Sequence, residues 1–136
     1  MDKREQMQTL AAEADYFQRQ LQDLQSQAQT LQMTEIEIDR TAEALKNLIE
    51  KKTSMFNLGS GVFVRADLRE VNKLLVNVGA SVLVEKDVPS SISFLEERKK
   101  EISEVRGELL KGMQSVSTRL REIDTEARFL MGEEGR

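Results

Sequence analysis

The chain has 136 residues and a net charge of −4, and Ala, Glu, Lys, Leu and Arg supply nearly half of it. This composition is typical of long helices or coiled coils, and a hydrophobic fraction of 39% is too high for a disordered chain. The sequence contains no Cys and no His, which removes disulfides, thiolate nucleophiles, the commonest general base and most metal ligands. We therefore expect no enzyme, no cofactor and no metal site.

Acidic and basic residues are interspersed along the whole chain. Residues 1–53 carry ten acids and seven bases, residues 54–89 four of each, and residues 90–136 ten acids and nine bases. A nucleic-acid interface needs clustered Lys and Arg, so we expect none. The longest charge-free apolar stretch, 74–84, is too short to span a bilayer, and no signal peptide is recognisable. Without membrane contact, and with a cysteine count that fits a reducing compartment, the expected location is the cytoplasm.

The first predicted element is a long helix over about residues 5–53. From Leu10 to Ile49, apolar residues recur at alternating steps of four and three, interrupted only at Glu35, and no Gly or Pro occurs before residue 59. A stripe of this length predicts a coiled-coil helix rather than a short amphipathic one.

The segment of about residues 54–87 follows a different pattern and predicts two β-hairpins. Two pairs of runs rich in β-branched residues flank short turns, the first at Gly59-Ser60-Gly61 and the second at Gly79-Ala80. Four short strands are marginally stable alone and leave unpaired edges. We therefore expect this head to oligomerise by strand addition into a closed or sandwiched sheet.

The last predicted element is a second coiled-coil helix over about residues 89–132. Apolar residues recur every seven positions from Leu95 to Leu130, and Asp87 with Pro89 marks the start, although the sequence leaves the capping residue undecided. Gly107 and Gly112 lie off the seam and should each cost about 1 kcal/mol of helix stability relative to Ala.

This order predicts an α+β fold in which a long antiparallel two-helix coiled coil carries the two inserted hairpins, and the hairpins assemble into an oligomeric β-barrel. The best match of large with small seam residues pairs positions whose numbers sum to 144, such as Leu31 with Met113. The same register predicts that Tyr16 and Phe129 lie at about the same height.

Three runs resemble the α-class subunits of prefoldin: 57–64 (NLGSGVFV), 76–86 and 91–98. Two hairpins distinguish the α class from the β class, and Asn57 departs from the Pro that relatives often carry. The resemblance implies a single prefoldin-like domain over residues 1–136 in a heterohexamer of two α-type and four β-type subunits. It also implies an ATP-independent chaperone, or holdase, that binds unfolded or nascent proteins at the coiled-coil tips and transfers them to a group II chaperonin.

Two sets of apolar residues are the candidate sites. At the tips, client binding is predicted for residues near the two chain ends: Met7, Leu10, Tyr16, Phe17, Phe129, Leu130 and Met131. In the head, oligomer contacts are predicted for strand residues: Phe56, Leu58, Val62, Val64, Leu74, Val76, Val78, Val82 and Val84. Exposed aromatic and Met side chains adapt to many shapes, although single apolar residues on a surface are also ordinary.

The alternative is a structural scaffold, tether or filament-forming subunit. In that case the coiled coil is a spacer, or the heads polymerise without β-type partners. The tips distinguish the two hypotheses, because a chaperone needs exposed apolar ends whereas a spacer can have inert ones.

Overall fold

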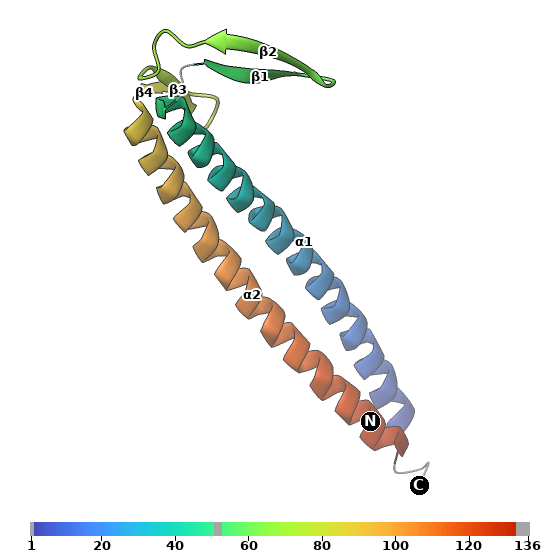
Figure 1. Cartoon of the computed structure of the whole chain (residues 1–136). Helices are drawn as coiled ribbons and strands as arrows, with labels where there is room; N and C mark the ends of the chain where they lie inside the picture. The colour runs from blue at the N-terminus through green and yellow to red at the C-terminus, as the bar shows by residue number, and fades with distance from the viewer. Residues whose placement is uncertain (1, 51–52, 133–136) are drawn as a thin grey trace. The chain divides into compact units, whose positions relative to one another are not determined.

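The structure, a computed structural model, describes residues 2–50 and 53–132. Figure 1 shows two long helices with two hairpins between them in the chain. The elements are α1 (Lys3–Glu50), β1 (Thr53–Gly59), β2 (Val62–Asp67), β3 (Leu74–Asn77), β4 (Leu83–Lys86) and α2 (Val88–Gly132). The predicted α+β order of helix, two hairpins and helix is confirmed. Residues 51 and 52, at the end of the predicted first helix, lie outside the described residues.

Both helices begin at an aspartate that caps their first turn. The N–H of Glu5 donates to Oδ1 of Asp2 at 2.8 Å, and the N–H of Ser90 donates to Oδ1 of Asp87 at 2.8 Å. A side-chain acceptor at this position satisfies a backbone N–H that has no partner within the helix. The structure thus identifies Asp87 as the cap of α2, with Pro89 tolerated in the first turn. Neither helix carries, within its described residues, an apolar stretch that could cross a membrane.

The four strands form two separate antiparallel hairpins. β1 pairs with β2, so that Phe56 faces Val64, and the register shifts between Asn57 and Gly59. β3 pairs with β4, so that Val76 faces Val84. Each sheet therefore has only two strands, and each strand keeps one edge that no described strand pairs.

The two hairpins repeat one turn of the same sequence and geometry. Residues 57–64 and 77–84 share the pattern Asn, apolar, Gly, two small residues, Val, apolar, Val. In each, the Asn side chain accepts a hydrogen bond from the N–H of the following Gly, at 2.8 Å in Asn57 and 2.9 Å in Asn77. Three consecutive residues then have positive φ, which is 108° at Gly59 and 122° at Gly79. Only Gly adopts such values without strain, which explains its presence at this position in both turns.

The chain divides into two compact units. One, the terminal unit, consists of the chain up to Met33 and the chain from Ser103 onward. The other, the hairpin unit, consists of Thr34–Ile102 and contains all four strands.

In the terminal unit α1 and α2 run antiparallel with an apolar seam between them. The buried seam residues are Leu10, Ala28, Val116 and Ile123. A Cβ on Gly112 would lie 3.6 Å from Cδ1 of Leu24. Leu31 lines a groove with Val105 and Leu109. Leu31 therefore lies near Val105 and Leu109 rather than opposite Met113. The two helices are shifted by about one heptad from the predicted pairing, so the predicted register is wrong.

The error in register has a physical reason. A shift by seven residues aligns the same heptad positions, so the size of seam residues distinguishes the two registers only weakly. The observed register instead fits Leu24 against the small Gly112 and brings oppositely charged side chains together beside the seam. As a consequence Phe129 lies beside Gln6 and Leu10, and the predicted common height of Tyr16 and Phe129 is also wrong.

In the hairpin unit the helical segments pack against each other and against β3. Ile38, Val88 and Ser91 are buried, and Nζ of Lys99 lies 2.8 Å from Oδ1 of Asp39 on the other helix. Residues of β3 line a cavity together with helical residues, among them Leu45 and Phe94. Ile49 is 56% exposed, so the predicted apolar stripe leaves the seam before this residue.

Candidate functional site

The terminal unit contains an open groove between α1 and α2, here called the terminal groove. Its volume is about 580 Å³. Its lining residues are Gln6, Thr9, Leu10 and Glu13 from α1 and Arg119, Thr125, Glu126, Phe129 and Leu130 from α2. Leu10 is buried at the helix seam, whereas Phe129 is 62% exposed. The groove therefore combines a packed apolar part with an aromatic side chain that stays accessible to solvent.

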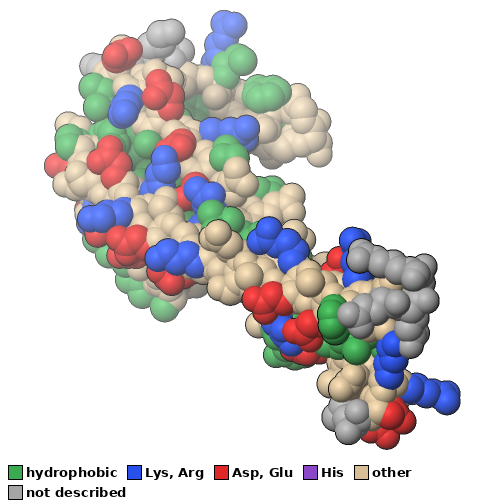
Figure 2. All heavy atoms as spheres, turned by 90° about the horizontal axis from the view of Figure 1, so that it is seen from below, with side chains coloured by type: hydrophobic (Ala, Val, Ile, Leu, Met, Phe, Trp, Pro, Cys, Tyr) green, Lys and Arg blue, Asp and Glu red, His purple; other side chains and the backbone are tan. Residues whose placement is uncertain are grey.

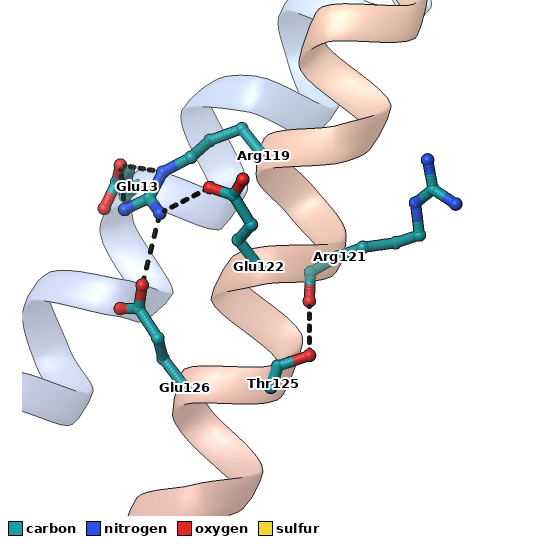
Figure 3. Close-up of polar contacts among 6 residues, drawn as sticks. All are labelled: Glu13, Arg119, Arg121, Glu122, Thr125 and Glu126. Carbon is teal, nitrogen blue, oxygen red and sulfur yellow. Dashed lines mark hydrogen bonds and ion pairs between the residues drawn. The ribbon is translucent and has the colours of Figure 1, made fainter.

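A cluster of charges borders this groove and joins the two helices. Nε of Arg119 donates to Oε1 of Glu13 at 2.8 Å, and Nη1 of Arg119 lies 3.2 Å from Glu122 and 3.3 Å from Glu126 (Figure 3). The hydrogen bond with Glu13 raises the pKa of Arg119, with smaller contributions from the other two carboxylates, so the guanidinium stays charged. Arg119 thus fixes where Glu13 and Glu126 lie along the rim of the groove.

The structure separates the predicted client-binding residues into three groups. Leu10, Phe129 and Leu130 line the terminal groove. Met7 lines a second groove of the same unit, together with Leu10 and Ala127.

The third group, Tyr16, Phe17 and Met131, lines neither of these two grooves. The rings of Tyr16 and Phe17 meet edge to face, with centroids 5.2 Å apart and an interplanar angle of 72°. Tyr16 is 62% exposed and Met131 60% exposed. The predicted client-binding residues of this unit are therefore divided between two grooves and positions outside them.

Most of the predicted assembly residues lie exposed on the hairpins. Phe56, Leu74 and Val76 are half-buried. The exposed ones are Leu58, Val62, Val64, Val78, Val82 and Val84.

Sequence reasoning missed four exposed apolar residues on the same strands: Met55, Phe63, Leu75 and Leu83. Side chains alternate between the two faces of a strand, so Phe63 lies on the face opposite to Val62 and Val64. The repeated turn supplies the signal that could have found two of them, since Phe63 and Leu83 occupy equivalent positions in the repeat. Strands that are apolar on both faces are typical of sheets covered on both sides.

Charges of both signs are mixed on the part of the surface that the structure describes. Figure 2 shows acidic and basic side chains interleaved on the visible face, with hydrophobic side chains in small groups among them. Among the described residues, no three acidic side chains are grouped so that they could hold a metal ion.

A family model for the prefoldin subunit matches residues 17–131. The chain belongs to the prefoldin family. It is 33% identical to the prefoldin subunit alpha of Thermofilum pendens over 122 residues, which cover 88% of this chain and 95% of that protein. It is 30% identical to the prefoldin subunit alpha of Archaeoglobus fulgidus over 129 residues, with coverage of 93% and 94%.

A solved prefoldin structure has the same fold. A chain of the filamentous PFD from Methanocaldococcus jannaschii superposes with a TM-score of 0.75 and 19% identity, over 85% of this chain and 98% of that one. Prefoldin subunits form oligomeric complexes and act as chaperone subunits in a family that is not catalytic. The predicted family and the predicted role as a chaperone subunit are thus confirmed, and the alternative of a structural scaffold, tether or filament-forming subunit is not favoured.

Proposed function

We propose that this chain is an α-type prefoldin subunit whose terminal unit holds unfolded or nascent polypeptides without ATP. One observation carries the proposal: the accessible ring of Phe129 lines an open groove of the terminal unit, and Tyr16 and Met131 are further exposed apolar residues of the same unit. A subunit whose coiled coil served only as a spacer would not need accessible apolar side chains near its chain ends. Accessible aromatic and Met side chains can pack against many different apolar segments.

The hairpin unit supports the assembly side of the proposal. Its exposed apolar strands and unpaired edges offer both apolar area and backbone hydrogen-bonding groups to neighbouring subunits. The expected complex has two α-type and four β-type subunits, lies in the cytoplasm, and uses no cofactor, nucleic acid or membrane. Residues 1–136 act in it as a single prefoldin-like domain that is not an enzyme.

The affinity of one terminal unit for a client should be low, whereas the affinity of the whole complex should be high. Burial of apolar surface contributes about 25 cal/mol per Å², so a few side chains at one terminal unit provide a modest affinity. Several terminal units that bind one client together convert this into tight but reversible holding. Release to a group II chaperonin then needs no nucleotide on the prefoldin side, because each contact can open separately.

The test replaces three exposed apolar residues of the terminal unit that lie near the chain ends. The variant Tyr16→Ser, Phe129→Ser, Met131→Ser should assemble normally but lose most of its ability to suppress turbidity of a heat-denatured client without nucleotide. The matched control is Met33→Ser, Val105→Ser, Leu110→Ser, which removes three exposed apolar side chains of the same unit that lie farther from the chain ends in sequence. A triple variant that assembles and suppresses turbidity as well as this control would contradict the proposal.

A further inference from the structure

The terminal groove has an apolar lining and a rim with surplus negative charge. Its volume of about 580 Å³ lies in the range of about 300–1,000 Å³ that is common for ligand pockets. Leu10, Phe129 and Leu130 form its apolar part. Arg119 is the only basic residue among its described lining residues, while Glu13 and Glu126 are both acidic.

The acidic surplus follows from the contacts of Arg119. One guanidinium meets three carboxylates, those of Glu13, Glu122 and Glu126, so that three negative charges less one positive charge leave two. Each of these contacts uses a single carboxylate oxygen, and every carboxylate has two. The cluster can therefore accept further N–H donors from a ligand without giving up Arg119.

Two nearby basic side chains, those of Arg121 and Arg128, have partners outside the cluster. Arg121 extends away from the cluster in Figure 3, and its Nη2 lies 3.5 Å from the hydroxyl of Thr118. Arg128 pairs with Asp124 at 3.1 Å. The rim thus offers carboxylate oxygens beside an exposed phenyl ring.

We infer that the terminal groove prefers client segments in which an apolar residue is flanked by Lys or Arg, over equally apolar segments flanked by Asp or Glu. This inference rests on the proposed holding function and adds a substrate class to it. The apolar side chain packs against Phe129 and Leu130, while the ammonium or guanidinium group donates to Glu122 or Glu126. An acidic flank would instead face carboxylates, and like charges at close range are disfavoured.

The preference should be moderate, because the rim is open to solvent. Exposed ion pairs contribute little individually, which corresponds to a ratio of about three to ten between the dissociation constants of the two segment types. Salt screens such contacts, so the ratio should shrink towards one as ionic strength rises. Holding of the apolar residue itself should depend much less on salt.

The experiment uses the full chain in complex with β-type partner subunits and three fluorescent peptides of equal length. The peptides share the same Leu and Phe residues, which are flanked by Lys, by Gln or by Glu, and anisotropy gives the dissociation constants at low and high salt. The expected order of affinity is Lys, then Gln, then Glu. The double variant Glu122→Gln, Glu126→Gln should bring the ratio between the Lys and Glu peptides close to one. The control Glu101→Gln, Glu104→Gln should keep the ratio of the unchanged chain.

Other results would overturn either the inferred preference, the holding function or the role of the groove. Equal affinity for the Lys and Glu peptides, or a ratio that survives Glu122→Gln, Glu126→Gln, overturns the inference and leaves the holding function intact. Failure of all three peptides to bind overturns the holding function itself. A ratio that also disappears in Glu101→Gln, Glu104→Gln assigns the preference to overall charge and overturns the role of the groove.

Discussion

The hairpin unit and the terminal unit both expose large apolar side chains, but they present them in different ways. In the hairpin unit these side chains lie on both faces of paired strands whose outer edges are unpaired. In the terminal unit they lie singly or in small groups on two helices, beside charged residues. The same kind of residue therefore forms two surfaces of different geometry.

The backbone explains this difference. A strand edge offers a row of N–H and C=O groups that a partner can match only in one register, so association through the hairpins is directional. A helix satisfies its backbone groups internally, except at its ends, so a partner that contacts the sides of the helices in the terminal unit meets mainly side chains. Side-chain contacts without a backbone register suit clients of many sequences, whereas an edge suits a fixed neighbour.

The largest expected effect concerns assembly. The double variant Val62→Asp, Val82→Asp puts a charge at equivalent positions of the two hairpins. Because an unpaired charge buried in an interface costs about 3–5 kcal/mol, association should weaken by at least about 100-fold. Native mass measurements should then find the chain outside its complex, with helix content unchanged.

The matched control adds the same two charges outside the strands, as Asn72→Asp, Ser93→Asp, at positions that are exposed. This control should assemble like the unchanged chain. Normal assembly of Val62→Asp, Val82→Asp would remove the assembly role that distinguishes the hairpin unit from the terminal unit.

A smaller effect concerns backbone conformation in the two units. Gly79 has a φ of 122°, so Gly79→Ala forces a side chain into a disfavoured region and should destabilise its hairpin by about 1–3 kcal/mol. Gly107 lies within α2 with open space around it, so Gly107→Ala should stabilise the helix by about 1 kcal/mol. Thermal unfolding of the two variants should therefore shift in opposite directions, and shifts in the same direction would contradict the assigned conformations.

The smallest effect concerns the cap that begins α2. Hydrogen bonds from the side chain and the backbone N–H of Ser90 lower the pKa of Asp87 below its ordinary value of 3.8. A carboxylate whose pKa is lower in the folded chain contributes stability above the unfolded pKa, and this contribution is lost as pH falls through the folded pKa. Asp87→Ala should therefore lower the stability of the chain slightly at pH 7.

The difference between Asp87→Ala and the unchanged chain should begin to shrink as the pH falls below the ordinary carboxyl pKa of 3.8, and it should be lost as the pH falls through the lower pKa of Asp87 in the folded chain. Chemical unfolding of both proteins at pH 7 and at pH 3 measures the loss of stability and its decrease at low pH. Equal stability of the two proteins at pH 7 would show that Asp87 does not cap the helix.

The order of elements could be predicted from sequence because its signals are local. A heptad stripe without Gly or Pro defines α1, and glycine turns between β-branched runs define the hairpins. The register of the helices could not be predicted in the same way, since it depends on a contact between Leu24 and Gly112 that lies across the seam. The heptad pattern fits the observed register and the shifted one equally well.

For the candidate sites, the sequence likewise predicted individual residues but not how they are grouped in space. Phe129 and Leu130 follow from apolar residues near a chain end, but their grouping with Leu10 around a groove depends on the register. The Arg119 cluster escaped prediction because its members lie on two helices and are separated by up to 113 residues in sequence, between Glu13 and Glu126. Phe63 and Leu83 escaped because the alternation rule assumes that one face of each strand is exposed to water.

Site-specific photo-crosslinking tests most directly whether the two units have separate roles. A benzoylphenylalanine replaces Phe129 in one variant and Phe63 in another, and each complex is irradiated with an unfolded client bound. We expect the probe at position 129 to crosslink to the client and the probe at position 63 to crosslink to neighbouring subunits. Crosslinks to the client from position 63, with none from position 129, would contradict the account.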